Sequence, residues 1–534
     1  MDRSISQGPS PDAGGAPLAM AAPQARTAVV VGLGLVLACL ALYQLTRPAY
    51  QTIYNHFAWQ AAAWLDGQFS IAYPVAASGQ GPGNAYFNDV IPVVDAAGMP
   101  TGRGMIPFPP LPAAVMLPLV AVGGLAVDQT FVAIIIGALD VAVAFWLLGR
   151  LRVRPAVRGL LTIFVGAGAA LWYAASLGST WYLAHVVAVG LTLASVGLAL
   201  DAEDREEARQ PGERRPLVDG RQVAAGFLLG LAATSRLTVA FGFPFLLLVG
   251  GGGSRWRRGI GAGIGMAIPI AGLLAYNLAA TGSLFNPVYE ALYRYEVLAY
   301  PYLGYDGTWS LQDVRYIPQN LGLMLFRPPD LMPPCAPGVP RTPWSAAGCS
   351  WLVPRQAGMS VLLASPAYLL ALPAFGLLRD RRVAGALLAS LAIAIVNLMH
   401  FSQGWVQFGY RFSLDFAPFL LVAMALGTER FLGPRGASRR LRLGVVVGLV
   451  AASVAIQAWG IAWARTLGWC ARCPAGAGPA PGCSRQPRPA PSRPWPSRSP
   501  GASCSPARGS GIPASSRPCR PSWAPPIPPG TRAT

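Results

Sequence analysis

Runs of about 20 apolar residues recur along most of this 534-residue chain, and each is long enough to cross the hydrocarbon core of a bilayer. A single water-soluble core cannot bury so many of them. The composition agrees, with 53% hydrophobic residues, only 12% charged residues and a mean hydropathy of +0.43. The sequence therefore predicts an all-α polytopic membrane protein.

We predict about eleven transmembrane helices and two long extracytoplasmic loops. The first helix follows a short polar segment that lacks a cleavable-signal pattern, so it is interpreted as a retained span. The predicted spans cover residues 27–46, 130–148, 159–176, 181–200, 222–235, 237–251, 259–281, 359–378, 383–400, 412–428 and 443–463. Residues 1–26 then form a short cytoplasmic N-terminus, residues 27–463 the transmembrane domain and residues 464–534 a tail.

Arginines orient the predicted helices, because short cytoplasmic loops collect positive charge. Five loops qualify, at residues 150–158, 201–221, 255–258, 379–382 and 430–442. They fall on one side only if the Pro-rich apolar segment 108–127 is re-entrant or interfacial. Residues 47–129 and 282–358 then form the two long extracytoplasmic loops, where we expect the chemistry.

The formal charge of +19 does not indicate a nucleic-acid-binding protein. Fifteen arginines and no acidic residue follow Glu429, which leaves 26 basic against 22 acidic residues up to that point. The transmembrane domain is nearly neutral, so we predict a lipid bilayer and no nucleic acid as partner.

The tail after about residue 464 differs sharply in composition from the helix ahead of it. It is dominated by Pro, Ser, Arg, Ala and Gly, holds five of the eight cysteines and shows no helical or strand period. The tail is interpreted either as disordered or as the product of a shifted reading frame in a GC-rich gene. Its WCARC pattern lacks a second cysteine pair at metal-binding spacing.

Five ionisable residues map to the outer ends of the predicted spans: His56, His185, Arg236, His400 and Arg411. Ionisable groups at membrane depth are costly, so a cluster of them at one leaflet predicts a functional site. Each residue taken alone also fits an interfacial anchor, and Arg411 also fits snorkelling to lipid headgroups.

The two outer loops add polar and aromatic side chains. The first contains a predicted interfacial helix, NHFAWQAAAWL, and the second carries tyrosines and Trp309, which suit either a membrane interface or stacking on sugars. Cys335 and Cys349 in the second loop can pair in an oxidising compartment. The polar candidates of the first loop are Asn55, His56, Asp66, Asn88, Asp89, Asp95 and Arg103.

Four segments together resemble the GT-C membrane glycosyltransferases, and among them the branch with protein O-mannosyltransferases and the aminoarabinose transferase of lipid A. They are YNHFAWQAAAWLDGQF, YFNDVIPVVDAAGMPTGRGMIPFPPLP, GFLLGLAATSRLTVAFGFPFLLL and QFGYRFSLDFAPFLL. The resemblance implies transfer of a sugar, with inversion, from a polyprenyl-phosphate donor to an extracytoplasmic acceptor, which is a glycan, a lipid or a protein.

That chemistry requires a base near the acceptor hydroxyl and cations near the leaving phosphate. The family places an Asp soon after the first span, where this chain has Asn55 and His56. We therefore predict Asp89 as the base, ahead of Asp66 and Asp95, and an inactive relative stays open. His56 would position the acceptor or the phosphate, and Asn55 would bond the sugar.

Arg103 stands where relatives place a basic residue that contacts lipid phosphate. The other predicted substrate-binding residues are Asn88, His185, Arg236, His400, Tyr410 and Arg411. The donor is already activated, so a divalent metal is not required, although one is compatible with the prediction.

A transporter or flippase of a lipid-linked or anionic solute is the alternative function, because broken helices with a charged apex also occur in transporters. The chain shows no internal repeat, and its large polar outer loops favour an enzyme. A third interpretation, a structural membrane scaffold, explains neither the cluster of ionisable residues at the outer face nor the split helices.

Overall fold

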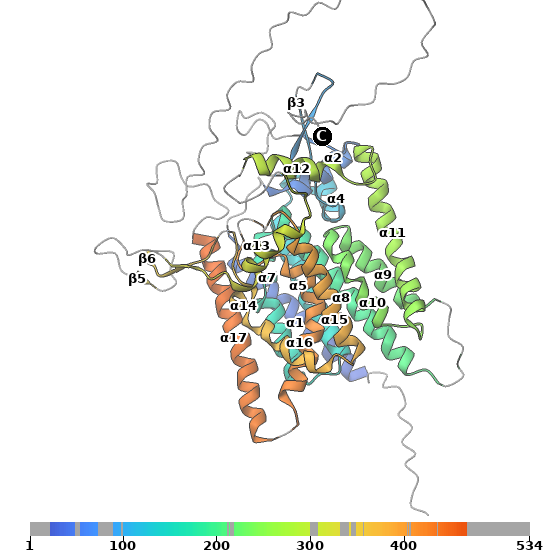
Figure 1. Ribbon diagram of the computed structural model, residues 1–534, viewed down its shortest axis with the longest axis vertical. Coiled ribbons are helices and arrows are strands. Elements are labelled where there is room, and N and C mark those ends of the chain that lie inside the picture. The colour runs from blue at the N-terminus through green and yellow to red at the C-terminus, as the bar shows by residue number, and fades with distance from the viewer. Residues whose placement is uncertain are drawn as a thin grey trace, which may run out of the picture.

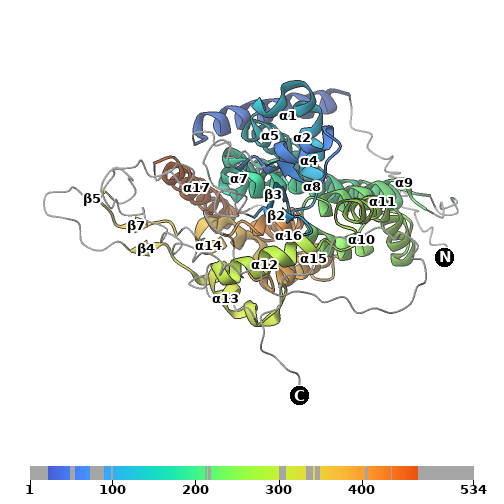
Figure 2. The ribbon, with the colours of Figure 1, turned by 90° about the horizontal axis from the view of Figure 1, so that it is seen from above.

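The computed structural model describes residues 22–48, 54–72, 89–97, 100–210, 213, 218–299, 308–331, 341–342, 349–355, 357–402, 404, 407–434 and 436–466. Its long helices run side by side (Figure 1). Seen from above, α9, α10 and α11 group on one side and α17 lies on the other, with α8 and α16 between them (Figure 2). The last described helix ends at Thr466, so residues 464–466 of the predicted tail are helical, and residues 467–534 and Cys335 lie outside the described residues.

Six described helices are long and apolar enough to cross a bilayer. A seventh arises if α6 (Pro155–Ile163) with η4 (Phe164–Gly168) and α7 (Ala170–Leu177), bent by 43°, form one span. These lengths and compositions identify a multi-pass membrane protein. The six are α1 (Ala22–Thr46), α5 (Gln129–Arg150), α8 (Thr180–Glu207), α11 (Arg255–Thr281), α15 (Arg381–Leu398) and α17 (Ala437–Thr466).

The remaining predicted spans coincide with shorter or less apolar helices, so the total of eleven stays a prediction. Arg236, with extended backbone (φ −138°, ψ 100°), separates α9 from η5. The predicted re-entrant segment forms α4 (Leu111–Gly123) and η3 (Gly124–Ala126). The other elements are α9 (Gly220–Ala233), η5 (Leu237–Gly242), α10 (Phe243–Leu248), α14 (Val361–Ala364), η9 (Pro366–Leu377) and α16 (Ser413–Leu432).

The two predicted outer loops contribute short elements at one end of the molecule, where Figure 1 shows α2, α4, α12 and β3 together. The predicted interfacial helix is α2 (His56–Leu65), whose Phe57 and Ala58 are buried together with Met116 of α4. An antiparallel sheet follows, in the order β1 (Ile71–Ala72), β3 (Pro100–Met105), β2 (Ile91–Val94).

The second outer loop combines short helices and two-residue strands in its described parts. Its elements are α12 (Pro287–Ala299), η7 (Val314–Tyr316), α13 (Ile317–Leu321), η8 (Gly322–Phe326) and the strands β4 (Asp330–Leu331), β5 (Arg341–Thr342), β6 (Cys349–Ser350) and β7 (Leu352–Val353).

Glycines allow α9 and α11 to approach closely. A Cβ atom at Gly226 would lie 2.0 Å from the carbonyl oxygen of Ala262, and one at Gly265 would lie 1.9 Å from that of Val223. Small residues at such contacts let helix backbones meet in a bilayer, where the hydrophobic effect does not drive helices together. The Ser235 hydroxyl donates to the carbonyl oxygen of Ala184 (2.8 Å) and holds the neighbouring Arg236 break beside α8.

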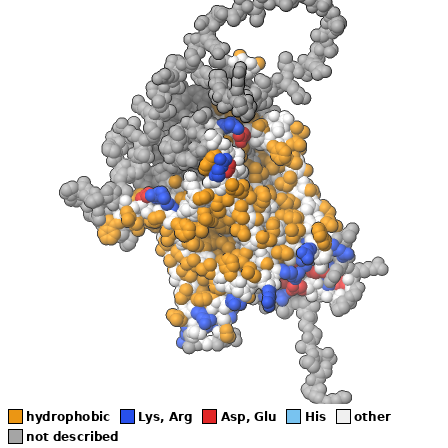
Figure 3. Space-filling model, viewed as in Figure 1, with side chains coloured by type: hydrophobic (Ala, Val, Ile, Leu, Met, Phe, Trp, Pro, Cys, Tyr) orange, Lys and Arg blue, Asp and Glu red, His pale blue; other side chains and the backbone are white. Residues whose placement is uncertain are grey.

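Ion pairs and one hydrogen bond to a backbone carbonyl join four of the five predicted cytoplasmic loops at the opposite end of the molecule. Asp201 pairs with Arg150 (2.7 Å) and Arg221 (2.6 Å), Arg381 pairs with Glu203 (3.1 Å), and Arg154 donates to the carbonyl oxygen of Gly433 (2.7 Å). Figure 3 shows charged side chains gathered below an apolar band on this face of the molecule. Four of these loops therefore lie at one end of the molecule, and the side of the membrane that this end faces stays a prediction.

Candidate functional site

The first turns of α8 place four side chains that contact most of the predicted site. Thr180, Trp181, Tyr182 and His185 lie within six residues of each other, close to the outer elements. A helix turns once every 3.6 residues, so Trp181 and His185 share one face. The four side chains contact, in order, His56, Asp89, Arg411 and Asp415.

His56 is fully buried and held by Thr180. The Thr180 hydroxyl donates to the carbonyl oxygen of Tyr54 (2.6 Å) and accepts from the His56 backbone N–H (3.2 Å). Because this hydroxyl has one proton, His56 Nδ1, at 2.6 Å from Thr180 Oγ1, must act as a donor. In the neutral ring, Nε2 therefore carries the lone pair. Asn55, which precedes α2, is also buried.

Asp89 lies beside His56 across the Trp181 ring. Its Oδ2 accepts a 2.5 Å hydrogen bond from Trp181 Nε1, and the Trp181 ring contacts the His56 ring edge-on at 5.9 Å. Asp89 has a positive φ of 66°, which Asp tolerates better than most residues. The structure thus joins the two predicted catalytic residues through one indole. We call Asn55, His56, Asp89, Thr180 and Trp181 the outer cluster.

Asp415, which the sequence interpretation did not select, is the centre of a second cluster. Its side chain is fully buried, and it accepts from His185 Nδ1 (2.9 Å), Arg236 Nη2 (2.9 Å) and Nε (3.2 Å), Thr238 Oγ1 (2.7 Å) and Asn397 Nδ2 (3.3 Å). A carboxylate has about four lone-pair sites, so these donors saturate it as an anion. The sequence feature that could have identified Asp415 is its position: it is an acidic residue in the first turn of an apolar span, four residues after Arg411.

The arginines of this cluster surround Phe412. The guanidinium of Arg236 lies 5.2 Å from the ring centroid and that of Arg411 lies 5.3 Å from it, while Arg411 also lies 5.6 Å from the Tyr182 ring. Arg236 binds Asp415 through Nε and Nη2, which leaves its Nη1 edge directed elsewhere. Two guanidinium groups and one carboxylate give a net positive site, and such a site suits an anion. We call His185, Arg236, Arg411, Phe412 and Asp415 the Asp415 cluster.

His400 and Tyr410 border the Asp415 cluster. The His400 ring lies 6.3 Å from that of Phe412, and its Nδ1 lies 3.1 Å from Gln312 Nε2. Burial, and next the Arg236 and Arg411 cations, lower the pKa of His400 to about 3, so the ring is neutral at neutral pH. Burial raises the pKa of Tyr410 well above its usual range and keeps the phenol protonated.

A row of aromatic rings connects the two clusters. Ring centroids are 6.5 Å apart from Trp181 to Phe108, 6.2 Å from Phe108 to Tyr289 and 5.9 Å from Tyr289 to His400. His400 then contacts Phe412. Residues from both outer loops and from three helix ends therefore form one continuous site.

Other predicted residues lie elsewhere. Arg103 on β3 donates to Ser70 Oγ (2.8 Å) and so braces the small sheet. Asp66 and Asp95 are exposed, the first after α2 and the second in a turn where it accepts from the Ala97 N–H (2.9 Å). Asn88 lies outside the described residues, so its predicted role stays untested.

The described aromatic side chains of the second outer loop lie in the aromatic row and in a buried cluster, and Tyr289 packs against both. Tyr289 belongs to the aromatic row, whereas the Tyr293 hydroxyl donates to the carbonyl oxygen of Trp309 (2.6 Å) in a buried cluster with Tyr316 and Phe401. Trp309 and Tyr293 thus have a packing role in this structure.

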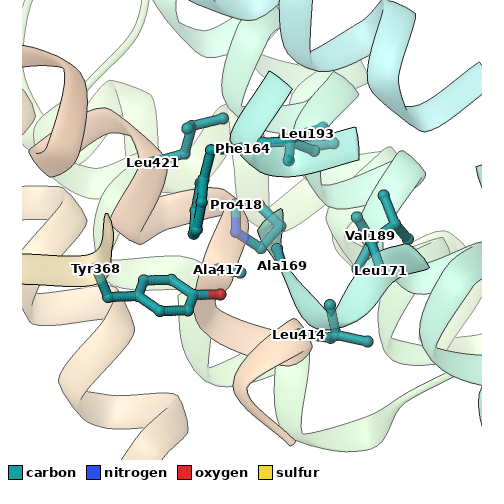
Figure 4. A pocket seen from close by; sticks show the side chains of 11 residues that line it. Phe164, Ala169, Leu171, Val189, Leu193, Tyr368, Leu414, Ala417, Pro418 and Leu421 are labelled. Carbon is teal, nitrogen blue, oxygen red and sulfur yellow. The ribbon is translucent and has the colours of Figure 1, made fainter. Parts of the chain in front are cut away.

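An apolar cavity lies deeper between α8 and α16 (Figure 4). Val189, Phe164 and Leu414 line it, with Tyr368 directed toward it. It begins one helical turn beyond His185, and its lining offers a sugar or phosphate almost no polar partner. Within the described part of the chain, no group of three or more His, Cys, Asp or Glu residues is arranged to hold a metal ion.

No family model and no curated protein sequence matches this chain. Solved structures are similar to it. ArnT from Cupriavidus metallidurans bound to undecaprenyl phosphate has a TM-score of 0.43 and 12% identity, with 84% of this chain and 78% of that chain covered. AglB, the oligosaccharyltransferase of Archaeoglobus fulgidus, in complex with an inhibitory peptide and a dolichol-phosphate, has a TM-score of 0.41 and 12% identity.

The match to AglB covers 82% of this chain and 56% of that chain. A second structure of the Archaeoglobus fulgidus oligosaccharyltransferase, tethered to an acceptor peptide, gives a TM-score of 0.41 at 12% identity, with 82% and 55% covered. This chain thus spans a little over half the length of the oligosaccharyltransferases.

Proposed function

We propose that the protein is a membrane glycosyltransferase that moves a sugar from a polyprenyl-phosphate donor to an extracytoplasmic acceptor of the cell envelope. One observation carries the proposal: two arginines converge on the Phe412 ring beside a single carboxylate, and aromatic rings join them to His56 and Asp89. The arrangement provides cations for a phosphate, aromatic surfaces for a sugar and a carboxylate for an acceptor.

The Asp415 cluster would bind the donor phosphate. Asp415 fixes the Arg236 plane before a ligand arrives, and the Nη1 edge of Arg236 would then meet the phosphate together with Arg411. Fixed cations stabilise charge that develops on a leaving group without a cost of reorganisation. As the bond from the anomeric carbon to the phosphate oxygen breaks, its electron pair moves to that oxygen, beside both guanidinium groups.

The outer cluster would activate the acceptor. Asp89 would take the proton of the acceptor hydroxyl as its oxygen attacks the anomeric carbon, and Trp181 Nε1 would hold the carboxylate in place. His56, with its lone pair on Nε2, would orient the acceptor, and Asn55 and Asn88 would bond the sugar. Arg103 would contact the lipid phosphate after exchanging its present bond to Ser70.

Transfer of radiolabelled sugar tests this function. Purified full-length protein in nanodiscs would receive a panel of polyprenyl-phosphate sugars and an envelope fraction as acceptor. We expect Asp89→Asn to lose about a hundredfold or more in rate, because a general base typically contributes that much. Arg236→Ala should lose a similar factor through the phosphate.

Matched controls are Asp204→Asn and Arg152→Ala, which alter an exposed ion pair at the opposite end of the molecule. Both should retain wild-type transfer. Full activity of Asp89→Asn would assign the base to another residue. An inactive wild type that instead carries a labelled polyprenyl-phosphate sugar across proteoliposome membranes would overturn the proposal in favour of a flippase.

A further inference from the structure

The tautomer of the His185 ring is defined, because its partner, the Asp415 carboxylate, can only accept a hydrogen bond. Asp415 is saturated by donors and ionised, so the proton of the neutral His185 ring must lie on Nδ1, 2.9 Å from Asp415 Oδ1. The lone pair then lies on Nε2. Arg236 and Thr238 hold Asp415 from the other side, which fixes the ring as well.

Nε2 of His185 is buried and has no hydrogen-bond partner among the described residues. An added proton there would therefore lack an acceptor in the described part of the chain, and it would stand close to two arginine cations. The titratable or charged side chains on the elements around His185 are Asp415, Arg411 and Tyr410 near the start of α16, Arg236 after α9, His400 after α15, Tyr173 on α7 and Asp140 on α5.

We propose that binding of a phosphate anion at Arg236 and Arg411 is coupled to the uptake of one proton by Nε2 of His185, which then donates this proton to the anion. The proposal rests on the proposed function, because it requires the donor phosphate at the Asp415 cluster. The proposal adds His185, as a protonated residue that binds the phosphate, to the two cations Arg236 and Arg411.

Electrostatics supports this coupling. A phosphate oxygen between the guanidinium groups offsets the charge that opposes an imidazolium, and it supplies the acceptor that Nε2–H needs. Asp415 pairs with the imidazolium through Nδ1–H at the same time. During transfer, the donor diester carries one negative charge and gains a second as the bond to the sugar breaks, so the Nε2 proton stands where that charge develops.

Isothermal titration calorimetry tests the coupling on full-length protein in nanodiscs. The probe is farnesyl methyl phosphate, a diester whose own charge is constant between about pH 6 and pH 8, the range in which histidines titrate. Titrations in buffers of different ionisation enthalpy count the protons taken up. We expect wild type to take up as much as one proton, with affinity falling by as much as about tenfold per unit rise in pH.

His185→Gln should bind the diester with no proton uptake and with the same affinity at each pH. Arg152→Ala, in an exposed ion pair at the opposite end of the molecule, is the control and should keep the wild-type pH dependence. Thermal melts and size exclusion confirm that each variant is folded. If His185→Gln fails to fold, ¹⁵N-histidine NMR of wild type and His400→Gln replaces it, since binding should change the His185 ring nitrogen shifts from neutral to protonated values.

The outcomes separate the two proposals. Binding without proton uptake in wild type overturns the coupling alone, as does uptake that persists in His185→Gln or a His185 ring that stays neutral when the probe is bound. Absence of binding at every pH removes the phosphate site, and with it both the coupling and the proposed function.

Discussion

At the scale of single residues, the candidate site residues were selected by one rule: an ionisable group in a membrane is costly. It selected His185, Arg236 and Arg411 from the sequence, and the structure brings all three to the ring of Phe412. It did not reveal Asp415, because the partner of a buried charge depends on how α8, α9 and α16 pack. Residues 230 positions apart, such as His185 and Asp415, meet only in the folded chain.

Asp415 also has a predictable effect on stability. Asp415→Ala would leave buried cations without their carboxylate, so we expect a loss of about 3–5 kcal/mol in the free energy of unfolding. Thr238→Val removes one donor of the same carboxylate and should cost about 1 kcal/mol. Denaturant unfolding in detergent measures both. Equal losses in the two variants would contradict the central role of Asp415.

At the scale of elements, the apolar runs predicted where helices form but not how they break. Each predicted span coincides with helical structure, yet the span predicted at residues 159–176 contains a π-helical turn and a 43° bend. Ala169 is extended there, with φ −114° and ψ 165°. The segment has no proline at this point; the helix bends where the π-helical turn with Gly166 and Gly168 ends, and periodicity alone does not indicate such a break.

The packing of α9 on α11 gives a sharp test with neighbouring glycines. A Cβ atom at Gly265 would meet the backbone of Val223, whereas one at Gly263, on the same helix, would have open space. Gly265→Ala should therefore cost about 1–3 kcal/mol through forced separation of the helices. Gly263→Ala should be neutral or stabilising by as much as about 1 kcal/mol. Melting temperatures in detergent compare them, and similar values for both would disprove this contact.

At the scale of the whole molecule, the distribution of arginines predicted which loops lie on one side. The ion pairs of Asp201 and Glu203 and the hydrogen bond from Arg154 to Gly433 bring four of these loops to one end. The outer loops were harder to interpret, because their roles depend on contacts with distant elements. Arg103, for example, braces the sheet in this structure, while its proposed phosphate contact awaits a test.

The predicted orientation can be measured by labelling of introduced cysteines. Asp95→Cys lies in the first outer loop, and Arg152→Cys lies in an exposed position at the opposite end. A membrane-impermeant maleimide applied to intact cells should label Asp95→Cys above the wild-type chain, whose own cysteines set the background, and should label Arg152→Cys no more than the wild-type chain. The reverse pattern would place the active site on the cytoplasmic face.

The short start of α8 has a consequence for substrate choice. Trp181 touches the proposed base and His185 touches the Asp415 carboxylate, and four residues of helix separate them by about 6 Å along the axis. Under the proposed function, one helix would therefore set the distance between the base that activates the acceptor and the site of the leaving phosphate. Changes in the outer loops could then admit a different acceptor while the distance between the proposed base and the proposed phosphate site stays the same.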